Sequence, residues 1–326
     1  MWTLVIDGGS SNTRAVLVRG GEPAAVEQVP VGVRDSAVGG RREVVARAAA
    51  QAAAAVLKRL QLEPADVRRW CGCGMLTSNL GLQEVPHLVA PVGMQDLARG
   101  AVRVVCSAWP YPPLTLIPGV RTGPDEGNPF GEMMRGEECE TFGLLAQMGL
   151  EPPAVCLLPG SHNKLVRIDR QGRIEAVWTS LAGEATRSLA EHTVLAGSMP
   201  PEGLPVEPDA HWLDRGVQLG RKGLLHAAFC VRAAQVLAGA DANQCASLLI
   251  GAVVGSDVRE MLEAGRIREA DVVVVGGADP LRRLYAGELA RRGVRAKAAP
   301  AQAAAWASAT GAAGIIQLAE ESSHGS

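Results

Sequence analysis

Two apolar runs separated by a turn of small polar residues open the chain. Residues 3–6 predict a buried strand that ends in Asp7, and residues 15–18 predict the strand that returns beside it. Glycines allow the backbone to come close to a ligand, and the amides and hydroxyls of such a turn can surround a phosphate. The turn consists of Gly8, Gly9, Ser10, Ser11, Asn12 and Thr13. An ordinary β-hairpin is the alternative, because turns favour the same residues.

The opening pattern recurs about 150 residues further along the chain. The second copy comprises a strand over 154–158, a turn over 159–164 and a strand over 165–168. Two copies of one supersecondary unit predict two similar domains. The stretch Glu151-Pro152-Pro153 marks the boundary, so we expect domains over residues 1–150 and 151–326.

Other apolar segments predict an alternation of helices and strands, which is typical of the α/β class. Helices are expected over 43–60, 133–149, 281–292 and 301–319, and a mostly helical stretch over 182–265 with a break at 199–208. Further strands are expected from residue 70 and over 174–179, 271–275 and 294–299. Loops are expected over 31–42 and 121–130, and a frayed polar tail over 320–326.

Charge and composition exclude several classes of function. The 326 residues carry 32 basic and 34 acidic side chains, so no basic footprint for nucleic acid or an acidic membrane is present. No apolar run approaches the roughly 18 residues of a membrane helix, and no signal peptide precedes the first strand. The seven cysteines include one C-x-C pair, Cys71 and Cys73, without a second pair for zinc. We therefore expect a cytoplasmic protein with buried thiols.

Several short motifs together resemble one family of sugar kinases. A third glycine turn, Gly276-Gly277-Ala278, follows the strand over 271–275, so three such turns occur in order. This order resembles the ATP site of the actin, Hsp70 and sugar-kinase superfamily. The finer motifs are DGGSSNTRA from Asp7, GMLTSNLG over 74–81, IPG over 117–119, MRGEE over 134–138, LPGSHNK over 158–164 and GE over 183–184. Over nearly its whole length, the chain resembles the 2-dehydro-3-deoxygalactonokinase family.

The resemblance implies a fold and a set of cofactors. We expect two RNase H-like, actin-like ATPase domains that face each other across a nucleotide cleft, with ATP and Mg²⁺ as cofactors. The first two turns would hold the ATP phosphates, and the third would meet the adenosine. The family often has Trp-Gly where Gly8-Gly9 stands and Thr where Ser161 stands, and loss of the aromatic could change how the cleft closes.

Phosphoryl transfer requires a metal, charge neutralisation and an acceptor for the hydroxyl proton. Asp7 at a strand end suits Mg²⁺, which usually keeps several waters. The second phosphate turn offers Gly160, Ser161 and Lys164, although a surface position for Lys164 is the alternative. The proton acceptor is expected at the start of the helix before that turn, where we favour Glu137, with Glu138 as substitute. Carboxylates that merely stabilise a helix N-terminus are the alternative.

Binding of a sugar acid requires a partner for its carboxylate. Arg135 is expected to neutralise that carboxylate or the transferred phosphoryl group, with a helix-start ion pair as the alternative. The loop with Gly74, Met75, Ser78 and Asn79 suits the acid, but could equally be structural. The sequence leaves the roles of His162, Glu184 and Arg187 open, and Glu184 with Arg187 could be a solvated helix pair.

These inferences predict an ATP-dependent kinase that phosphorylates the 6-hydroxyl of 2-dehydro-3-deoxy-D-galactonate. A kinase for another acid sugar or amino sugar, and a non-catalytic nucleotide-sensing protein, are the alternatives. The expected partners are the sugar acid and ATP, with no nucleic acid and no membrane, and a homodimer is possible. The sequence fixes neither the stereochemistry of the sugar acid nor the oligomeric state.

Overall fold

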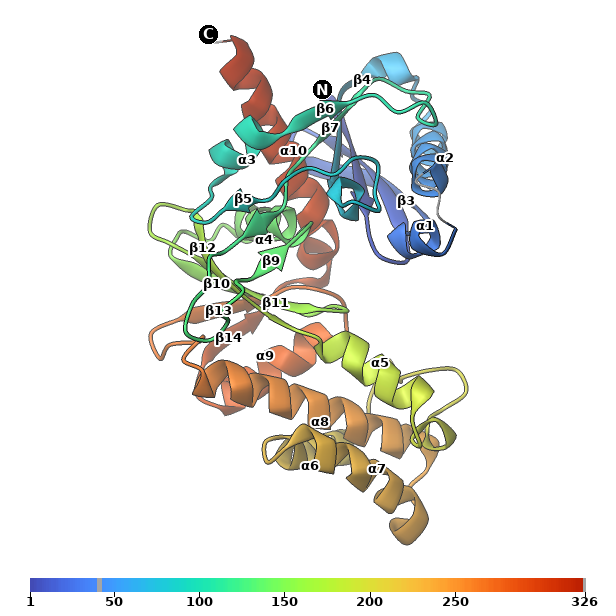
Figure 1. Ribbon diagram of the computed structural model, residues 1–326, viewed down its shortest axis with the longest axis vertical. Helices are drawn as coiled ribbons and strands as arrows, with labels where there is room; N and C mark the ends of the chain where they lie inside the picture. Colours follow the sequence, from blue (N-terminus) through green and yellow to red (C-terminus); the bar gives the residue numbers. More distant parts are fainter. Residues whose placement is uncertain (40–42, 325–326) are drawn as a thin grey trace. The chain divides into compact units, whose positions relative to one another are not determined.

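Two larger sheets with related strand orders organise the protein (Figure 1). The computed structural model describes residues 1–39 and 43–324. The first sheet has the order β3-β2-β1-β4-β7-β6, and the second has the order β12-β11-β10-β13-β14. In both, three strands consecutive in the chain are followed by strands added in parallel, β4 beside β1 and β13 beside β10. The predicted repeat of the strand–turn–strand pattern is confirmed.

The element bounds are as follows. The first sheet contains β1 (Trp2–Gly8), β2 (Thr13–Arg19), β3 (Glu22–Val29), β4 (Val67–Gly74), β6 (Val102–Val104) and β7 (Leu114–Leu116). The second contains β10 (Ala154–Leu158), β11 (Asn163–Ile168), β12 (Ile174–Ser180), β13 (Val272–Val275) and β14 (Arg295–Ala298). A small third sheet contains β5 (Leu88–Val89), β8 (Val120–Arg121) and β9 (Met133–Met134). The helices are α1 (Val33–Gly39), α2 (Glu43–Leu60), α3 (Met94–Gly100), α4 (Glu137–Met148), α5 (Ala182–His192), α6 (Ala210–Gly220), α7 (Leu224–Ala238), α8 (Ala242–Glu263), α9 (Leu281–Arg291) and α10 (Ala301–His324).

The chain forms two compact units. Unit 1 contains Met1–Pro153, Val166–Val177 and Gln302–Ser326, and unit 2 contains Ala154–Leu165 and Trp178–Ala301. Unit 1 is therefore assembled from three separate segments of the chain. The division into domains at residue 150 and a nucleotide cleft between them stay predictions.

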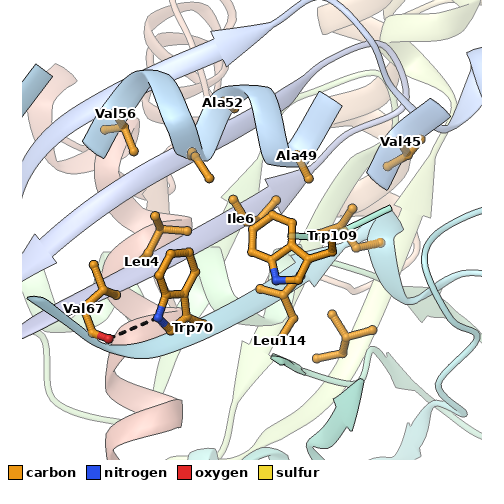
Figure 2. Close-up of a cluster of buried hydrophobic side chains, with 14 of the residues drawn as sticks. Leu4, Ile6, Val45, Ala49, Ala52, Val56, Val67, Trp70, Trp109 and Leu114 are labelled. Atoms are coloured by element: carbon orange, nitrogen blue, oxygen red, sulfur yellow. Dashed lines mark hydrogen bonds between the residues drawn. The ribbon is translucent and has the colours of Figure 1, made fainter. Parts of the chain in front are cut away.

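The core of unit 1 lies between α2 and the first sheet. Figure 2 shows Ala49, Ala52 and Val56 of α2 facing Leu4 and Ile6 of β1, and all five are fully buried. Alanines let the helix lie close to the sheet, and the apolar area removed from water stabilises the pair by about 25 cal/mol per Å². The helix predicted over residues 43–60 is confirmed with the same bounds.

The helices of unit 2 pack closely through glycines. Gly216 and Gly220 of α6 lie against α8, and Gly251 and Gly255 of α8 lie against α6. A Cβ at any of the four positions would collide with a backbone carbonyl oxygen of the other helix. Two glycines on each helix, spaced four residues apart, therefore let the two backbones approach directly. Figure 1 shows α6, α7 and α8 as neighbouring helices.

Three sequence expectations need correction. The loop expected over 31–42 forms α1 in its middle part, because Val33 and Arg34 donate their amides to the carbonyls of Gly9 and Ser10; residues 40–42 lie outside the described residues. Strand β3 was not predicted, although it pairs with β2 along its whole length. The tail does not fray at Glu320, which continues α10 and pairs with Arg69 at 2.8 Å; residues 325–326 lie outside the described residues.

Of the helices in the described part of the chain, none combines the length and apolar character that a membrane span requires.

Candidate active site

The turn after β1 is held against the loop that follows β4. Gly8 and Gly74 are partners in the parallel register of these strands. Gly74 has a positive φ of 68°, and a Cβ there would lie 2.5 Å from the carbonyl oxygen of Gly8. Glycine is required at this position for both reasons. The first turn therefore lies beside the loop with Gly74, Met75, Ser78 and Asn79, at the edge of the sheet where β1 and β4 end. We call this loop the substrate loop, after its expected role.

The first turn is also fixed from the side of α1. Gly32 lies so close to Ser10 and Ser11 that a Cβ would collide with their backbone. The Thr13 hydroxyl donates to the carbonyl of Val31 at 2.8 Å, so this buried side chain supports the turn from within the protein. Within the turn, Ser11 is exposed, while Gly9, Ser10 and Asn12 are half-buried. The Gly9 amide donates to the Asn12 carbonyl at 2.8 Å, so the other backbone amides and the two serine hydroxyls are the groups that this turn can offer to a ligand.

Asp7 is paired with an arginine that the sequence analysis did not single out. Arg14 lies opposite Asp7 in the antiparallel register, and its guanidinium donates to Asp7 Oδ2 at 2.5 Å. The Asp7 carboxylate is the main cause that raises the pKa of Arg14. Asp7 Oδ1 lies 3.9 Å from the Cys73 thiol, on the side away from Arg14. The motif DGGSSNTR contains both charged residues, so a search for a cation near Asp7 would have found Arg14.

A magnesium ion fits the donor set near Asp7. Among the described residues, no group of three or more His, Cys, Asp or Glu side chains could hold a metal. A single carboxylate nevertheless suits Mg²⁺, which is bound by one or two carboxylates together with phosphate oxygens and waters. Asp7 would hold this ion, which neutralises charge on the transferred phosphoryl group.

Two glutamates at the start of α4 have different environments. Both carboxylate oxygens of Glu138 accept from the Gly136 amide at 2.8 Å, and Glu137 Oε2 accepts from the Arg135 amide at 3.0 Å. Glu138 is fully buried, whereas Glu137 is half-buried. Burial is the main cause that raises the pKa of Glu138 to about 8, and the charge of Glu137 raises it further. Gly136, which precedes both, approaches Gly74 so closely that a Cβ would lie 3.1 Å from the Gly74 Cα.

Arg135 ties the substrate loop to α4. Its guanidinium donates to the Thr77 hydroxyl at 2.8 Å and to the Val85 carbonyl at 2.9 Å. It also lies 3.3 Å from His87 Nδ1, and burial is the main cause that lowers its pKa. These contacts make Arg135 a support for the loop. Its role toward a substrate carboxylate or the transferred phosphoryl group stays a prediction.

The substrate loop divides into supported and exposed residues. Ser78 is buried, and its hydroxyl donates to the Met75 carbonyl at 2.8 Å. Asn79, the next residue, is exposed, and Met75 is half-buried. Asn79 is therefore the polar side chain of this loop that is presented to solvent.

Unit 2 repeats this arrangement with its own pair of turns. Because Leu157 and Val275 are partners in the register of β10 and β13, Pro159 and Gly277 occupy the places of Gly8 and Gly74. Gly277 also has a positive φ, 73°, and a Cβ there would lie 2.5 Å from the Pro159 carbonyl oxygen. The second and third turns are about 115 residues apart in sequence but lie side by side, which the sequence order alone did not establish.

A cavity of about 950 Å³ lies beside these turns. Gly160, Ser161 and Ala278 of the predicted residues line it, and so does Arg187 on α5. Gly276 and Gly277 do not line it. The Gly276 amide donates to the Leu157 carbonyl, and Gly277 packs against the Pro159 backbone. The rest of the wall is largely apolar and comes from α5, α8 and the segment that follows α5. Its volume and mixed lining suit a small molecule with an apolar and a polar end.

The charged residues near the second turn have defined partners. Lys164 is only 6% exposed, and its Nζ donates to the Thr179 hydroxyl at 3.0 Å. This burial excludes the alternative of a solvated surface lysine. His162 Nε2 lies 2.9 Å from Glu184 Oε2, so Glu184 has a partner on the turn itself. Asn163 is buried beneath the turn and is the residue whose importance the sequence analysis underestimated.

Comparison with known proteins identifies the family. Residues 7–312 match the sequence profile of the family described as 2-keto-3-deoxy-galactonokinase. The chain belongs to this family. The match covers both units and all three glycine turns, so the expectation of a sugar kinase is confirmed. None of the curated proteins searched matches the chain.

Solved structures show that the kinase shares its fold with other proteins. A protein from Sinorhizobium meliloti, provisionally named a 2-dehydro-3-deoxygalactonokinase, is 22% identical with a TM-score of 0.75, covering 97% of this chain and 98% of that one. Component A of (R)-2-hydroxyglutaryl-CoA dehydratase from Acidaminococcus fermentans is 14% identical with a TM-score of 0.53, covering 99% of both chains. At these identities the likeness concerns the fold alone. The expected fold class, α/β of the actin-like ATPase type, is confirmed.

Proposed function

We propose that this kinase transfers the γ-phosphoryl group of ATP to the 6-hydroxyl of 2-dehydro-3-deoxy-D-galactonate, which yields the 6-phosphate and ADP. The observation that carries the proposal is the family match over residues 7–312, which includes every predicted site residue. The presence of both acidic residues at the start of α4 supports catalysis over a purely nucleotide-sensing role.

Glu137 is our candidate for the proton acceptor. A primary hydroxyl must lose its proton as the new P–O bond forms, and a positioned carboxylate can accept it. Glu137 is half-buried and held at the helix start by the Arg135 amide, whereas Glu138 is fully enclosed. The accessible carboxylate is the better acceptor for a proton of a bound substrate. Asn79 on the neighbouring loop is our candidate for a contact to the sugar acid.

The phosphate contacts are assigned to the exposed parts of the two turns. In unit 1 these are Ser10, Ser11 and Asn12, while Thr13 supports the turn through Val31. Gly8 is buried and the Gly9 amide donates to the Asn12 carbonyl, so the two glycines would shape the turn for a close approach of the phosphates. In unit 2 Ser161 would donate to the phosphates. The Gly160 amide is held by Asn163 Oδ1, so Gly160 would allow a close approach, and Lys164 supports the turn through Thr179. The cavity beside Ala278 is assigned to the adenosine, with Gly276 and Gly277 holding the turn that carries Ala278 against β10 and Pro159. A homodimer and a cytoplasmic location stay predictions.

A coupled assay of ADP release tests the proposed function. We expect turnover with ATP, Mg²⁺ and 2-dehydro-3-deoxy-D-galactonate, and weaker turnover with its gluconate epimer. The position of the phosphate in the product, determined by NMR, should be the 6-oxygen. Preferred turnover of an amino sugar or of a different acid sugar would replace the proposed substrate, and absence of any turnover with such a panel would contradict the kinase mechanism.

A further inference from the structure

A buried hydrogen-bond network lies beneath the second turn in unit 2. Asn163 Nδ2 donates to Asp257 Oδ2 on α8 and to the Tyr285 hydroxyl on α9, both at 2.7 Å. The Tyr285 hydroxyl in turn donates to Asp257 Oδ2 at 2.8 Å. The exposed fractions are 1% for Asn163, 5% for Asp257 and 1% for Tyr285. Three polar side chains from distant parts of the chain thus meet at a buried site, where Asn163 and Tyr285 also form part of the cavity wall.

The network fixes the orientation of the Asn163 amide. Because both hydrogens on Nδ2 point toward Asp257 and Tyr285, Oδ1 faces the turn and accepts from the Gly160 amide at 3.0 Å. If the amide rotated by half a turn, Nδ2 would face the Gly160 N–H, and two donors would oppose each other. Asp257 and Tyr285 therefore determine which way the peptide before Gly160 points.

The other side of the turn is closed by α5. A Cβ at Gly183 would collide with the Gly160 carbonyl oxygen, and the Glu184 amide donates to the Ser161 carbonyl at 2.8 Å. Both carbonyls of the turn are therefore turned toward α5. Gly160 and Ser161 remain exposed along the cavity. Burial raises the pKa of Asp257, and hydrogen bonds from Ser180, Tyr285 and Asn163 oppose this shift.

We propose that Asp257 and Tyr285 are positioning residues, which hold Asn163 so that the Gly160–Ser161 segment is preorganised for the phosphates of a nucleotide. The proposal rests on the proposed function, since it assumes that this turn binds phosphate. Asp257 does not line the cavity. Tyr285 does line it at 1% exposure, but in this proposal its hydroxyl acts through Asn163, and Tyr285→Phe keeps the ring that lines the cavity. Preorganised donors bind an anion without a further cost of ordering, so loss of the network should weaken phosphate binding selectively.

Nucleotide binding by calorimetry, with ADP and adenosine as probes, tests the proposal. In Tyr285→Phe we expect the affinity for ADP to fall about tenfold while the affinity for adenosine changes less than twofold. Asp257→Asn keeps an acceptor for both donors and should bind ADP nearly as the parent does, whereas Asp257→Leu should lose ADP binding more strongly than Tyr285→Phe. This rescue by the conservative variant distinguishes hydrogen bonding from charge.

The chain offers a matched control. Its other tyrosine, Tyr111, stacks on Trp70 in unit 1 at a centroid distance of 5.1 Å. Tyr111→Phe should leave both affinities unchanged. Equal losses for ADP and adenosine in Tyr285→Phe, or no loss for either, would overturn the positioning role. If the parent enzyme binds ADP no better than adenosine, the proposed function itself fails, and the two failures are thereby distinguished. Thermal unfolding of each variant confirms that the protein measured is folded.

Discussion

Asp7 and Arg14 lie directly opposite each other on β1 and β2, and their side chains form an ion pair of 2.5 Å. The side chain of Asp7 is 13% exposed and that of Arg14 is 37% exposed, so the pair is open on the arginine side. A carboxylate with one oxygen held by a cation and the other near Gly74 has a fixed orientation. Fixed orientation is what a residue needs to place a hydrated metal ion.

If Asp7 holds Mg²⁺, Asp7→Asn should lower kcat by about two orders of magnitude or more, because the amide loses the charge that binds the ion. Steady-state kinetics at saturating ATP and Mg²⁺ measure this loss. Asp214→Asn on α6, a half-buried residue that accepts from Gln218, is the matched control and should retain parental activity. A folded Asp7→Asn enzyme with near-parental kcat would refute the assignment.

The two glutamates of α4 should differ in kinetics. Glu137→Gln removes the negative charge and the basic oxygen, so kcat should fall about 10²- to 10⁴-fold with little change in either KM. Glu138→Gln should lower kcat less, because this side chain is enclosed and bonded to the Gly136 amide. The two variants are measured side by side. An inactive Glu138→Gln beside an active Glu137→Gln would show that Glu138, and not Glu137, is the proton acceptor.

Burial of Glu138 should make stability depend on pH. Its folded-state pKa of about 8 lies above the ordinary value of 4.5, so between these values the folded protein keeps a proton that the unfolded chain has lost. The contribution of Glu138 to the free energy of unfolding should therefore be largest below pH 4.5 and should decrease as the pH rises to about 8. Glu138→Gln should flatten this decline, which urea unfolding at pH 6 and pH 8.5 measures. A decline of the same slope in the variant would mean that another group is responsible.

Asn79 should affect the sugar acid alone. Its exposed side chain follows the buried Ser78 on the loop beside Gly8, so truncation leaves the supporting contacts intact. Asn79→Ala should raise the KM for the sugar acid about tenfold, as expected for the loss of one or two hydrogen bonds, and leave the KM for ATP unchanged. Initial-rate kinetics with each substrate varied in turn measure both constants. Equal changes in the two constants would indicate a structural role.

Two glycine-to-alanine substitutions should have opposite effects on stability. At Gly251 a Cβ would collide with the Leu213 carbonyl oxygen of α6, so Gly251→Ala should destabilise unit 2 by about 1 to 3 kcal/mol. At Gly287 in α9 nothing lies within 4 Å of the Cβ position, so Gly287→Ala should stabilise by up to about 1 kcal/mol through helix propensity. Urea unfolding of both variants measures the difference. A stable Gly251→Ala would show that α6 and α8 can separate without loss.

Local patterns predicted the elements of this kinase better than its contacts. The alanine-rich pattern of α2 and the valine run of β13 determine a helix and a strand by themselves. Helix α1 was missed because its first amides are satisfied by the turn at Gly9 and Ser10, which is a tertiary contact. For the site, the motifs indicated the turns but not their supports. Asn163 depends on Asp257 and Tyr285, which are 94 and 122 residues away in sequence, and no local pattern connects residues at such distances.

The division of unit 1 into three segments has a consequence for synthesis on the ribosome. Gly143 of α4 and Gly311 of α10 let these helices touch, and a Cβ at either would collide with the backbone of the other helix. About 150 residues separate the end of α4 from α10. Because the ribosome adds about 5–20 residues per second, α10 is synthesised roughly 10 to 30 s after α4. Unit 2 emerges in between and can fold first. A nonsense or frameshift mutation within α10 would therefore leave unit 2 intact. In unit 1 it would expose the surface of α4 that α10 normally covers, which chaperones and proteases could then reach.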